Sequence, residues 1–204
     1  MTAARRFVPI TTTVLGVLII LTGCVGPNTI TPTTASPTQS PAPNTSLTEA
    51  PKSREEAWLE ATRTIVDFVD AQYAIQADTG ANPERIEPYA TGSALKNVKD
   101  VAAGLAEKHI TTTGHPKWSP NASASTFGDL NPQGGATIPN GIVYVRGCFD
   151  VSDQVPTYAG GSPAPVSTQR IYPVQFNVLY LSTDRTWKVD SLQNIVGQQG
   201  APAC

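Results

Sequence analysis

Imidazole and thiol groups are the side chains whose spacing in this chain could support chemistry. His109 and His115 are the only histidines, and they flank a run of threonines with no second pair of ligands nearby. The sequence holds no Gly-x-Ser-x-Gly elbow, no glycine-rich phosphate loop and no His-Glu-x-x-His metal motif. A hydrolase triad would have to draw on one of the two histidines. We therefore predict surface or helix-capping roles for both, and we expect no metal and no cofactor.

The thiol of Cys24 stands at the end of an N-terminal export pattern. Two arginines precede an apolar stretch from 14 to 21, which is too short to span a bilayer. The sequence that follows, Leu21-Thr22-Gly23-Cys24, resembles the bacterial lipobox. This resemblance implies cleavage after Gly23 and lipidation of Cys24. The protein would then be held by its lipid on the extracytoplasmic face of a bacterial cell membrane. An ordinary signal peptide with an incidental cysteine is the alternative.

The two remaining cysteines, Cys148 and Cys204, are an even pair in a chain predicted to be exported. Such a pair is typical of a disulfide. Because Cys204 is the last residue, the bridge would tie the C-terminus to a strand and close a loop of 57 residues, from 148 to 204. Two alternatives stay open, namely a free and buried Cys148 or an intermolecular bond through Cys204.

Composition divides the chain into three segments: a signal peptide over 1–23, the lipid-attachment cysteine and a disordered stalk over 24–52, and a folded domain over 53–204. Threonine, serine and proline fill 16 of the 28 positions from 25 to 52. So polar a segment cannot bury enough apolar surface to offset the entropy of ordering. Its prolines favour extended conformations, so we predict a plain spacer, with a specific recognition segment as the alternative.

Net charge excludes one class of partner. Without residues 1–23 the chain keeps 12 basic and 16 acidic residues, a net charge of −4, and it has no basic cluster. This balance argues against a nucleic acid partner. The remaining 150 or so residues are enough for one compact domain with a core.

The first part of the domain shows helical periodicity. Ser53 and Glu56 form a capping box that begins a helix ending near Ala77. A short helix is predicted over 83–87, and a third helix that follows Gly92 is expected to fray into 111–114. Apolar residues recur at three- and four-residue spacing on one face of each long helix. These residues are Trp58, Ala61, Ile65, Phe68, Val69 and Ile75 in the first, and Leu95, Val98, Val101, Ala102 and Leu105 in the third.

The rest of the domain changes to strand periodicity. Long strands are predicted over 142–149 and 172–180, with a loop over 156–167 between them. A turn leads from the second into a strand over 186–189, and a weaker strand is predicted over 117–127. Val143, Val145 and Phe149 share one side of the first long strand. Helices followed by antiparallel strands predict an α+β domain whose sheet curls over the helices.

This order of elements resembles the NTF2-like, cone-shaped α+β fold. More narrowly, residues 53–204 are similar to small secreted actinobacterial lipoproteins that carry such a domain. In those proteins a strand ends in a Cys-x-Asp-x-Ser pattern, here Cys148-Phe149-Asp150-Val151-Ser152, and a Trp-containing last strand precedes a C-terminal cysteine. The resemblance implies N-terminal helices packed in a strongly curved antiparallel sheet, but it implies no particular reaction. In this chain the loop after Ser152 is longer and richer in proline and glycine than the pattern usually carries.

The fold resemblance also implies one possible form of catalysis. NTF2-like cones can hold a carboxylate in an apolar pocket, where desolvation raises its pKa and makes it a useful base. The competing interpretation is structural, because aspartates on a polar helix face and aromatic side chains such as Tyr172 more often have ordinary surface and core roles. The candidate bases are Asp67, Asp70, Asp100 and Asp150, and the possible pocket residues are Tyr73, Tyr144, Asp150 and Phe176.

Together these patterns predict a lipid-anchored envelope protein that binds another protein, or less readily a small apolar ligand, without catalysis. Two alternatives belong to other classes. One is a cone-pocket enzyme of the isomerase or dehydratase type that uses a buried aspartate as general base. The other is a stalked accessory subunit of an envelope export or conjugation apparatus. An open cavity that holds a buried aspartate would favour the enzyme.

Overall fold

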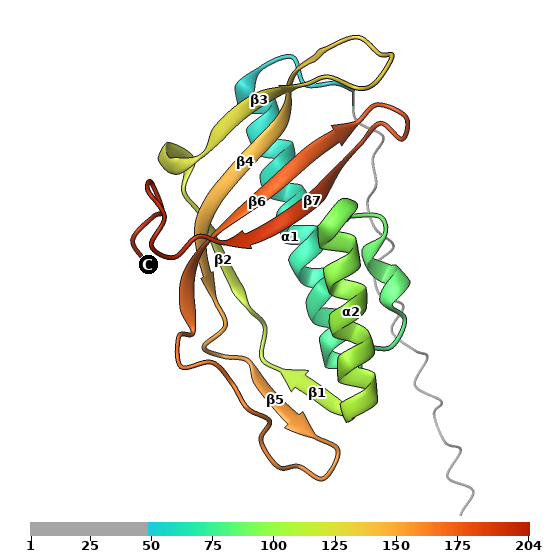
Figure 1. The fold of residues 1–204 in the computed structure, drawn as a ribbon, viewed down its shortest axis with the longest axis vertical. Coiled ribbons are helices and arrows are strands. Elements are labelled where there is room, and N and C mark those ends of the chain that lie inside the picture. Colours follow the sequence, from blue (N-terminus) through green and yellow to red (C-terminus); the bar gives the residue numbers. More distant parts are fainter. Residues whose placement is uncertain (1–48) are drawn as a thin grey trace, which may run out of the picture. The chain divides into compact units, whose positions relative to one another are not determined.

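The computed structural model describes residues 49–204 (Figure 1). The predicted signal peptide, its cleavage site at Gly23, the lipidation site Cys24 and the stalk up to residue 48 lie outside the described residues. None of the described helices is long and apolar enough to cross a membrane. The described elements are, in order, α1 (Arg54–Ala77), η1 (Pro83–Ile86), α2 (Gly92–Lys108), β1 (Ile110–Thr113), β2 (Lys117–Pro120), η2 (Ala122–Ala124), β3 (Thr126–Leu130), β4 (Ile138–Asp150), β5 (Val155–Tyr158), β6 (Ile171–Leu181) and β7 (Thr186–Asn194).

Helix α1 begins where its capping residues predict. The side chain of Ser53 accepts a hydrogen bond from the Glu56 N–H at 3.1 Å, which satisfies one of the free donors of the first turn. The Glu56 carboxylate accepts a second hydrogen bond from the Lys52 N–H at 2.6 Å. The predicted apolar face is confirmed, since Ala61, Ile65, Phe68, Val69 and Ile75 are buried and Trp58 packs against the same core.

Helix α2 departs from its prediction at both its face and its end. Val98 and Ala102 are buried as predicted, but Val101 is 48% exposed and does not belong to the core. The helix does not fray into the threonines. His109 ends it in a left-handed conformation (φ 50°), and the chain then continues directly into strand β1.

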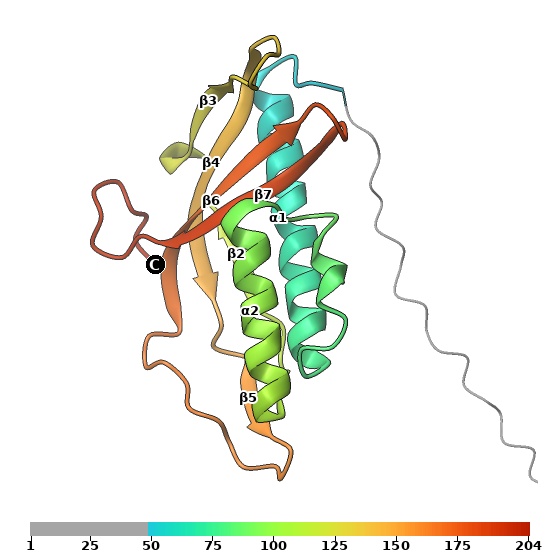
Figure 2. The ribbon, with the colours of Figure 1, turned by 45° about the vertical axis from the view of Figure 1, so that its right-hand side comes forward.

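Five strands form one curved antiparallel sheet against which α1 packs (Figures 1 and 2). The order is β2–β4–β6–β7, and β3 pairs with the part of β4 that β2 leaves free. The prediction of one weak strand over 117–127 is therefore wrong. The chain makes two strands there, and between them the Asn121 side chain caps η2 by accepting from the Ala124 N–H at 3.1 Å.

The core lies between α1 and the inner face of the sheet. Val143, Val145 and Phe149 are buried on one side of β4, as their alternation predicts. The hairpin of β6 and β7 is also confirmed, and its turn follows Leu181. Helices packed on a curved antiparallel sheet confirm the α+β class.

The outer edge of β7 is partly covered by the chain that links η1 to α2. Ala90 forms a parallel bridge with Val189. The Thr91 N–H donates to the Val189 carbonyl at 2.9 Å, and the Val189 N–H donates to the Tyr89 carbonyl at 2.8 Å. This crossing also fixes where α2 starts beside β7.

A second, two-stranded sheet joins β1 and β5, with Ile110 opposite Tyr158 and Thr113 opposite Val155. The sequence predicted a frayed helix end at the first strand and, from 156 onward, a plain loop at the second. Both predictions are wrong at these positions. The β-branched residues of Ile110–Thr113 find a pairing partner more than forty residues later in the chain, which local periodicity cannot show.

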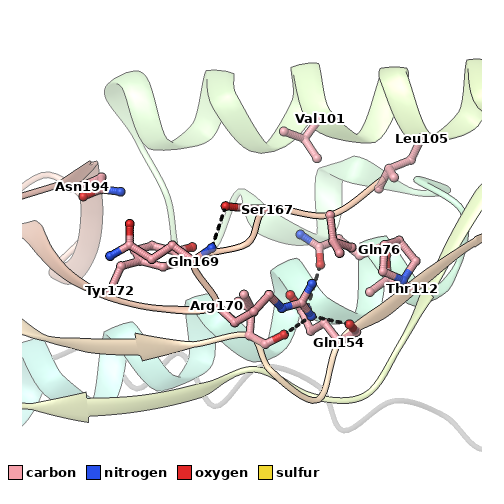
Figure 3. A pocket seen from close by; sticks show the side chains of 13 residues that line it. Gln76, Val101, Leu105, Thr112, Gln154, Ser167, Gln169, Arg170, Tyr172 and Asn194 are labelled. Carbon is pink, nitrogen blue, oxygen red and sulfur yellow. Dashed lines mark hydrogen bonds between the residues drawn. The ribbon is translucent and has the colours of Figure 1, made fainter. Parts of the chain in front are cut away.

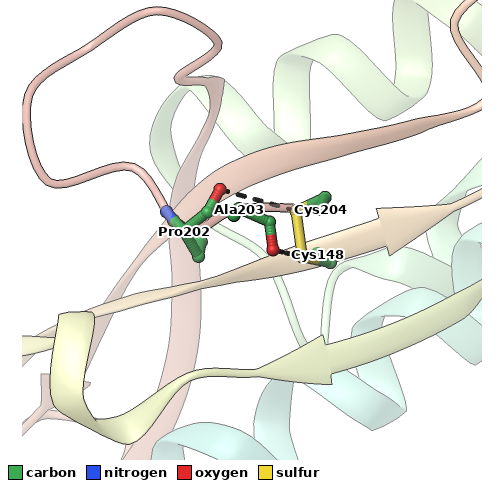
Figure 4. Close-up of a disulfide and its surroundings, with 4 residues drawn as sticks. All are labelled: Cys148, Pro202, Ala203 and Cys204. Atoms are coloured by element: carbon green, nitrogen blue, oxygen red, sulfur yellow. Dashed lines mark hydrogen bonds between the residues drawn. A yellow bond between two sulfur atoms is a disulfide. The ribbon is translucent and has the colours of Figure 1, made fainter.

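The predicted disulfide between Cys148 and Cys204 is present, with Cα atoms 5.7 Å apart (Figure 4). Tyr144, Arg146 and Cys148 are alternate residues of β4 and therefore share one face of the strand, the less buried one. The bridge lies on this outer face. Arg146 also holds the C-terminal segment, because its Nη1 donates to the Gly200 carbonyl at 3.1 Å.

Candidate functional site

Phe176, one of the four residues predicted to form a pocket, is completely buried in the core. Its ring lies edge-on to Trp118 at 4.9 Å, to Phe68 at 6.1 Å and to Phe149 at 6.5 Å between centroids. Edge-on aromatic packing of this kind stabilises a core beyond simple burial. Phe176 therefore fills the space between helix and sheet and lines no open cavity.

Tyr144 lies on the opposite face of the sheet from Phe176. Phe176 is in register with the buried Val145, whereas Tyr144 is in register with Asn177 on the neighbouring strand. Because successive side chains of a strand alternate between its faces, Tyr144 and Phe176 cannot share one pocket. The alternation was visible in the sequence, and it argued against grouping them.

Tyr73 and Asp150 are engaged elsewhere. The Tyr73 ring packs against the His115 ring with centroids 4.6 Å apart. At the end of β4, Asp150 accepts a hydrogen bond from the Ser152 N–H at 2.8 Å. Hydrogen bonds from the Ser152 side chain and backbone hold the pKa of the Asp150 carboxyl below its ordinary value. That is the opposite of the shift a general base requires.

The other candidate bases have different surroundings. Burial raises the pKa of the Asp67 carboxyl, Arg63 opposes this rise and Asp70 adds to it. The direction is the one that the buried-base hypothesis requires, but Asp67 does not line the pocket described below. Asp70 lies 3.1 Å from Nε2 of His115, and Asp100 pairs with a lysine one turn earlier on α2.

The histidines occupy capping and surface positions. His109 is the C-cap residue of α2, and its side chain is exposed. His115 is also exposed, and its Nδ1 lies 2.7 Å from the Pro116 carbonyl. Within residues 49–204 no group of three or more histidine, cysteine, aspartate or glutamate side chains could hold a metal ion.

A pocket of about 270 Å³ lies between α2 and the chain that enters β6 (Figure 3). Val101 and Leu105 project into it from α2 (Figure 3), and Val151, Pro156 and Val166 add apolar surface to its lining. Val101 is 48% exposed and Val166 is 53% exposed, so apolar surface at the mouth of the pocket faces solvent. Exposed apolar side chains that gather around a cavity are typical of binding sites.

Amide and hydroxyl side chains line the rest of the pocket. Nε2 of Gln154 donates to Oε1 of Gln76 at 3.2 Å, which links the pocket floor to α1. The Ser167 hydroxyl accepts a hydrogen bond from the Gln169 N–H at 3.2 Å, which fixes the turn before β6. Burial raises the pKa of the Tyr172 hydroxyl, so this group stays a neutral donor at physiological pH. The remaining polar residues of the lining are Thr112 and Asn194.

Among residues 49–204, Arg170 is the only residue of the lining with a formal charge. Its Nη2 donates to the backbone carbonyls of Val151 and Gln154, and these bonds fix the guanidinium plane at the pocket wall (Figure 3). Both acceptors are neutral. The pocket therefore combines apolar walls, four side-chain amides and one oriented cation, a set suited to holding a ligand by shape and hydrogen bonds.

No protein-family model matches this chain, and no curated protein matches it in sequence. Among solved structures, it is similar to the crystal structure of the intermembrane space region of the chloroplast protein ARC6. The two are 17% identical, the TM-score is 0.43, and the match covers 65% of this chain and 94% of that one. A likeness at this level shows neither a shared family nor a shared function.

None of the four residues named as a pocket from the sequence lines this one, although Tyr172 was among the aromatics considered. Two signals could have pointed to it. Val101 lies beside the more buried Val98 and Ala102 and widens the apolar stripe of α2 beyond what one contact face needs. The long loop rich in proline and glycine, already unusual for the resemblance, supplies Val166 and Ser167.

Proposed function

We propose that this protein is a lipid-anchored binding module on the extracytoplasmic face of a bacterial membrane, and that it binds its partner at the pocket between α2 and β6. The pocket lining is the observation that carries the proposal, because it offers exposed apolar surface beside amides and one cation. The lipobox sequence that ends at Cys24 supports the anchor. In this interpretation the partner is an envelope protein or a small ligand with apolar character.

We also propose that residues 53–204 form an NTF2-like domain. A long first helix held inside a curved antiparallel sheet, with a second helix beside the last strand, supports this assignment. Strands β1 and β5 form a separate small sheet next to the pocket. A domain of this type would place the pocket at the open end of the cone.

Mass spectrometry of the mature N-terminus, with and without globomycin, tests the anchor. We expect a lipid-modified Cys24 as the first residue, and accumulation of the precursor when the signal peptidase for lipoproteins is inhibited. Replacement of Cys24 by serine should release the protein from the membrane fraction. An unmodified Cys24 in the native host would remove the anchor from the proposal.

Site-specific crosslinking tests the binding site. A photoreactive phenylalanine analogue is placed at Val101 or Val166 at the pocket, and at Val66 as a matched control. Val66 is 49% exposed on α1, close to the 48% of Val101 on α2. We expect the same adduct from both pocket positions and none from Val66. Equal adducts from all three positions would contradict the assignment of the pocket as the binding site.

A further inference from the structure

The pocket contains a positive charge whose direct hydrogen-bond partners are uncharged. Arg170 is half-buried, and its Nη2 is bound by the carbonyls of Val151 and Gln154. Within residues 49–204, Arg170 forms no salt bridge with an acidic side chain, and no carboxylate lines the pocket. The charge of Arg170 contributes to lowering the pKa of the Asp150 carboxyl, but that carboxylate already accepts hydrogen bonds from Ser152. The cation is thus oriented at the pocket wall without being neutralised there.

Other hydrogen-bond donors line the same pocket as this cation. The side-chain amides of Gln154 and Gln169 and the hydroxyl of Tyr172 line the same pocket. A guanidinium binds a carboxylate more strongly than it binds a neutral acceptor, because the hydrogen bonds are assisted by charge. A carboxylate is also the group that leaves such a cation and its neighbouring donors satisfied at once.

The pocket lining also has an apolar part. Val101 and Leu105 project into the pocket from α2 (Figure 3), and Val166 is a further apolar residue of the lining. At about 30 Å³ for each water-sized group, a volume of 270 Å³ holds about nine non-hydrogen atoms. The pocket is therefore large enough for a carboxyl group that carries a short aliphatic chain.

We propose that this pocket binds an aliphatic monocarboxylate, with the carboxylate at Arg170 and the hydrocarbon chain against Val101, Leu105 and Val166. This inference rests on the proposed function and adds the chemical class of the ligand. Two sources share this chemistry, a free short-chain carboxylic acid and the C-terminal residue of an apolar polypeptide. The probes below distinguish them.

The test is a calorimetric and NMR titration of the full-length protein with hexanoate, N-acetylleucine, hexanol and hexylamine. We expect hexanoate to bind with a Kd on the order of 1 mM, as its size allows, and at least about tenfold more tightly than hexanol or hexylamine. The side-chain amide signals of Gln154 and Gln169 should shift on binding. Tighter binding of N-acetylleucine than of hexanoate assigns the site to polypeptide C-termini.

Variants at half-exposed positions should fold like the parent protein, so that a change in hexanoate affinity reports on binding alone. Val101→Asp removes an apolar contact and adds a negative charge at the pocket mouth, so it should weaken hexanoate binding about tenfold. Val101→Lys loses the same apolar contact without adding negative charge, so it should weaken binding less. The control Val66→Asp, on the other helix, should leave binding unchanged. Arg170→Gln should abolish the preference for hexanoate over hexanol, and Arg170→Lys should retain part of it.

Equal binding of hexanol and hexanoate overturns the inference, as does a Val101→Asp variant that binds hexanoate as tightly as Val66→Asp does. Failure of the inference about the ligand class is distinguishable from failure of the proposed binding site. If no carboxylate binds but crosslinks form at Val101 and Val166 and not at Val66, the ligand class is wrong and the binding module stands. If those crosslinks are also missing, the site itself is wrong.

Discussion

Removal of the disulfide should cost a large part of the stability of this domain. We predict that replacing both Cys148 and Cys204 by serine lowers the free energy of unfolding by about 4 kcal/mol. The bridge joins residues 56 apart in the sequence. In the chain-entropy model, a closed loop of this length removes about 14 cal/mol/K from the unfolded ensemble, which is about 4 kcal/mol at 25 °C.

The magnitude is expected to come mainly from the unfolded state, because the C-terminal segment makes few other contacts. The Ile195 side chain is buried, and its N–H donates to the Pro173 carbonyl at 3.0 Å, so the chain is held up to that point without the bridge. Beyond it, the hydrogen bond from Arg146 to Gly200 is a contact with β4 at the surface. A single exposed hydrogen bond adds about 1 kcal/mol or less.

The assay is urea unfolding followed by tryptophan fluorescence, with the double variant compared with the parent protein. A matched control carries Cys148→Ser and ends at residue 198, so that it lacks both the bridge and the C-terminal residues 199–204. We expect both altered proteins to unfold at similar, lower urea concentrations, and the slope of the transition to increase because the unfolded chain is more expanded. A loss below about 1 kcal/mol in the double variant would refute the entropic argument. A control much less stable than the double variant would show that the surface contacts dominate.

Three further predictions concern single residues. Gly104→Ala should raise stability by about 1 kcal/mol, because Gly104 lies inside α2 and a Cβ there would meet nothing within 4 Å. Gly147→Ala should lower stability by about 1–3 kcal/mol, because its Cβ would lie 2.3 Å from the Ser119 carbonyl oxygen and 2.5 Å from the Trp118 ring. Urea midpoints check both, and a shift of either in the other direction contradicts the packing described. Asp67→Asn should stabilise the domain at pH 7 but not near pH 3. Burial raises the pKa of Asp67 in the folded state, so the folded protein favours the protonated carboxyl. The stability that this protonated carboxyl contributes is lost as pH rises through the folded-state pKa, and a neutral asparagine does not suffer that loss. Melting curves at the two pH values test this, and a destabilised Asp67→Asn at pH 7 would count against it.

The sequence predicted the elements whose causes are local. Helix α1 carries its own cap at Ser53 and a continuous apolar stripe, and β4 carries strict alternation from Val143 to Phe149. Each of these signals is complete within one segment of the chain. The prediction that Cys148 pairs with Cys204 rested on two observations, the number of cysteines and the export pattern of the N-terminus.

The features that the sequence missed depend on segments far apart in the chain. Strand β1 is a strand because β5 pairs with it, and neither segment shows a pattern longer than four residues. The pocket has the same origin. Val101 on α2 and Arg170 before β6 become neighbours of one cavity only through the path of the intervening loop, and no spacing in the sequence records that path.

The crossing of Tyr89–Thr91 beside β7 has a consequence for how copies of this protein can meet. An open strand edge offers unpaired peptide groups to any neighbouring chain, and it promotes fusion of sheets when molecules are crowded on a surface. At β7 the peptide groups of Val189 are already used within the molecule. Two copies that meet are therefore prevented from pairing their β7 strands at Val189, which interrupts any continuous intermolecular sheet at that point of the edge.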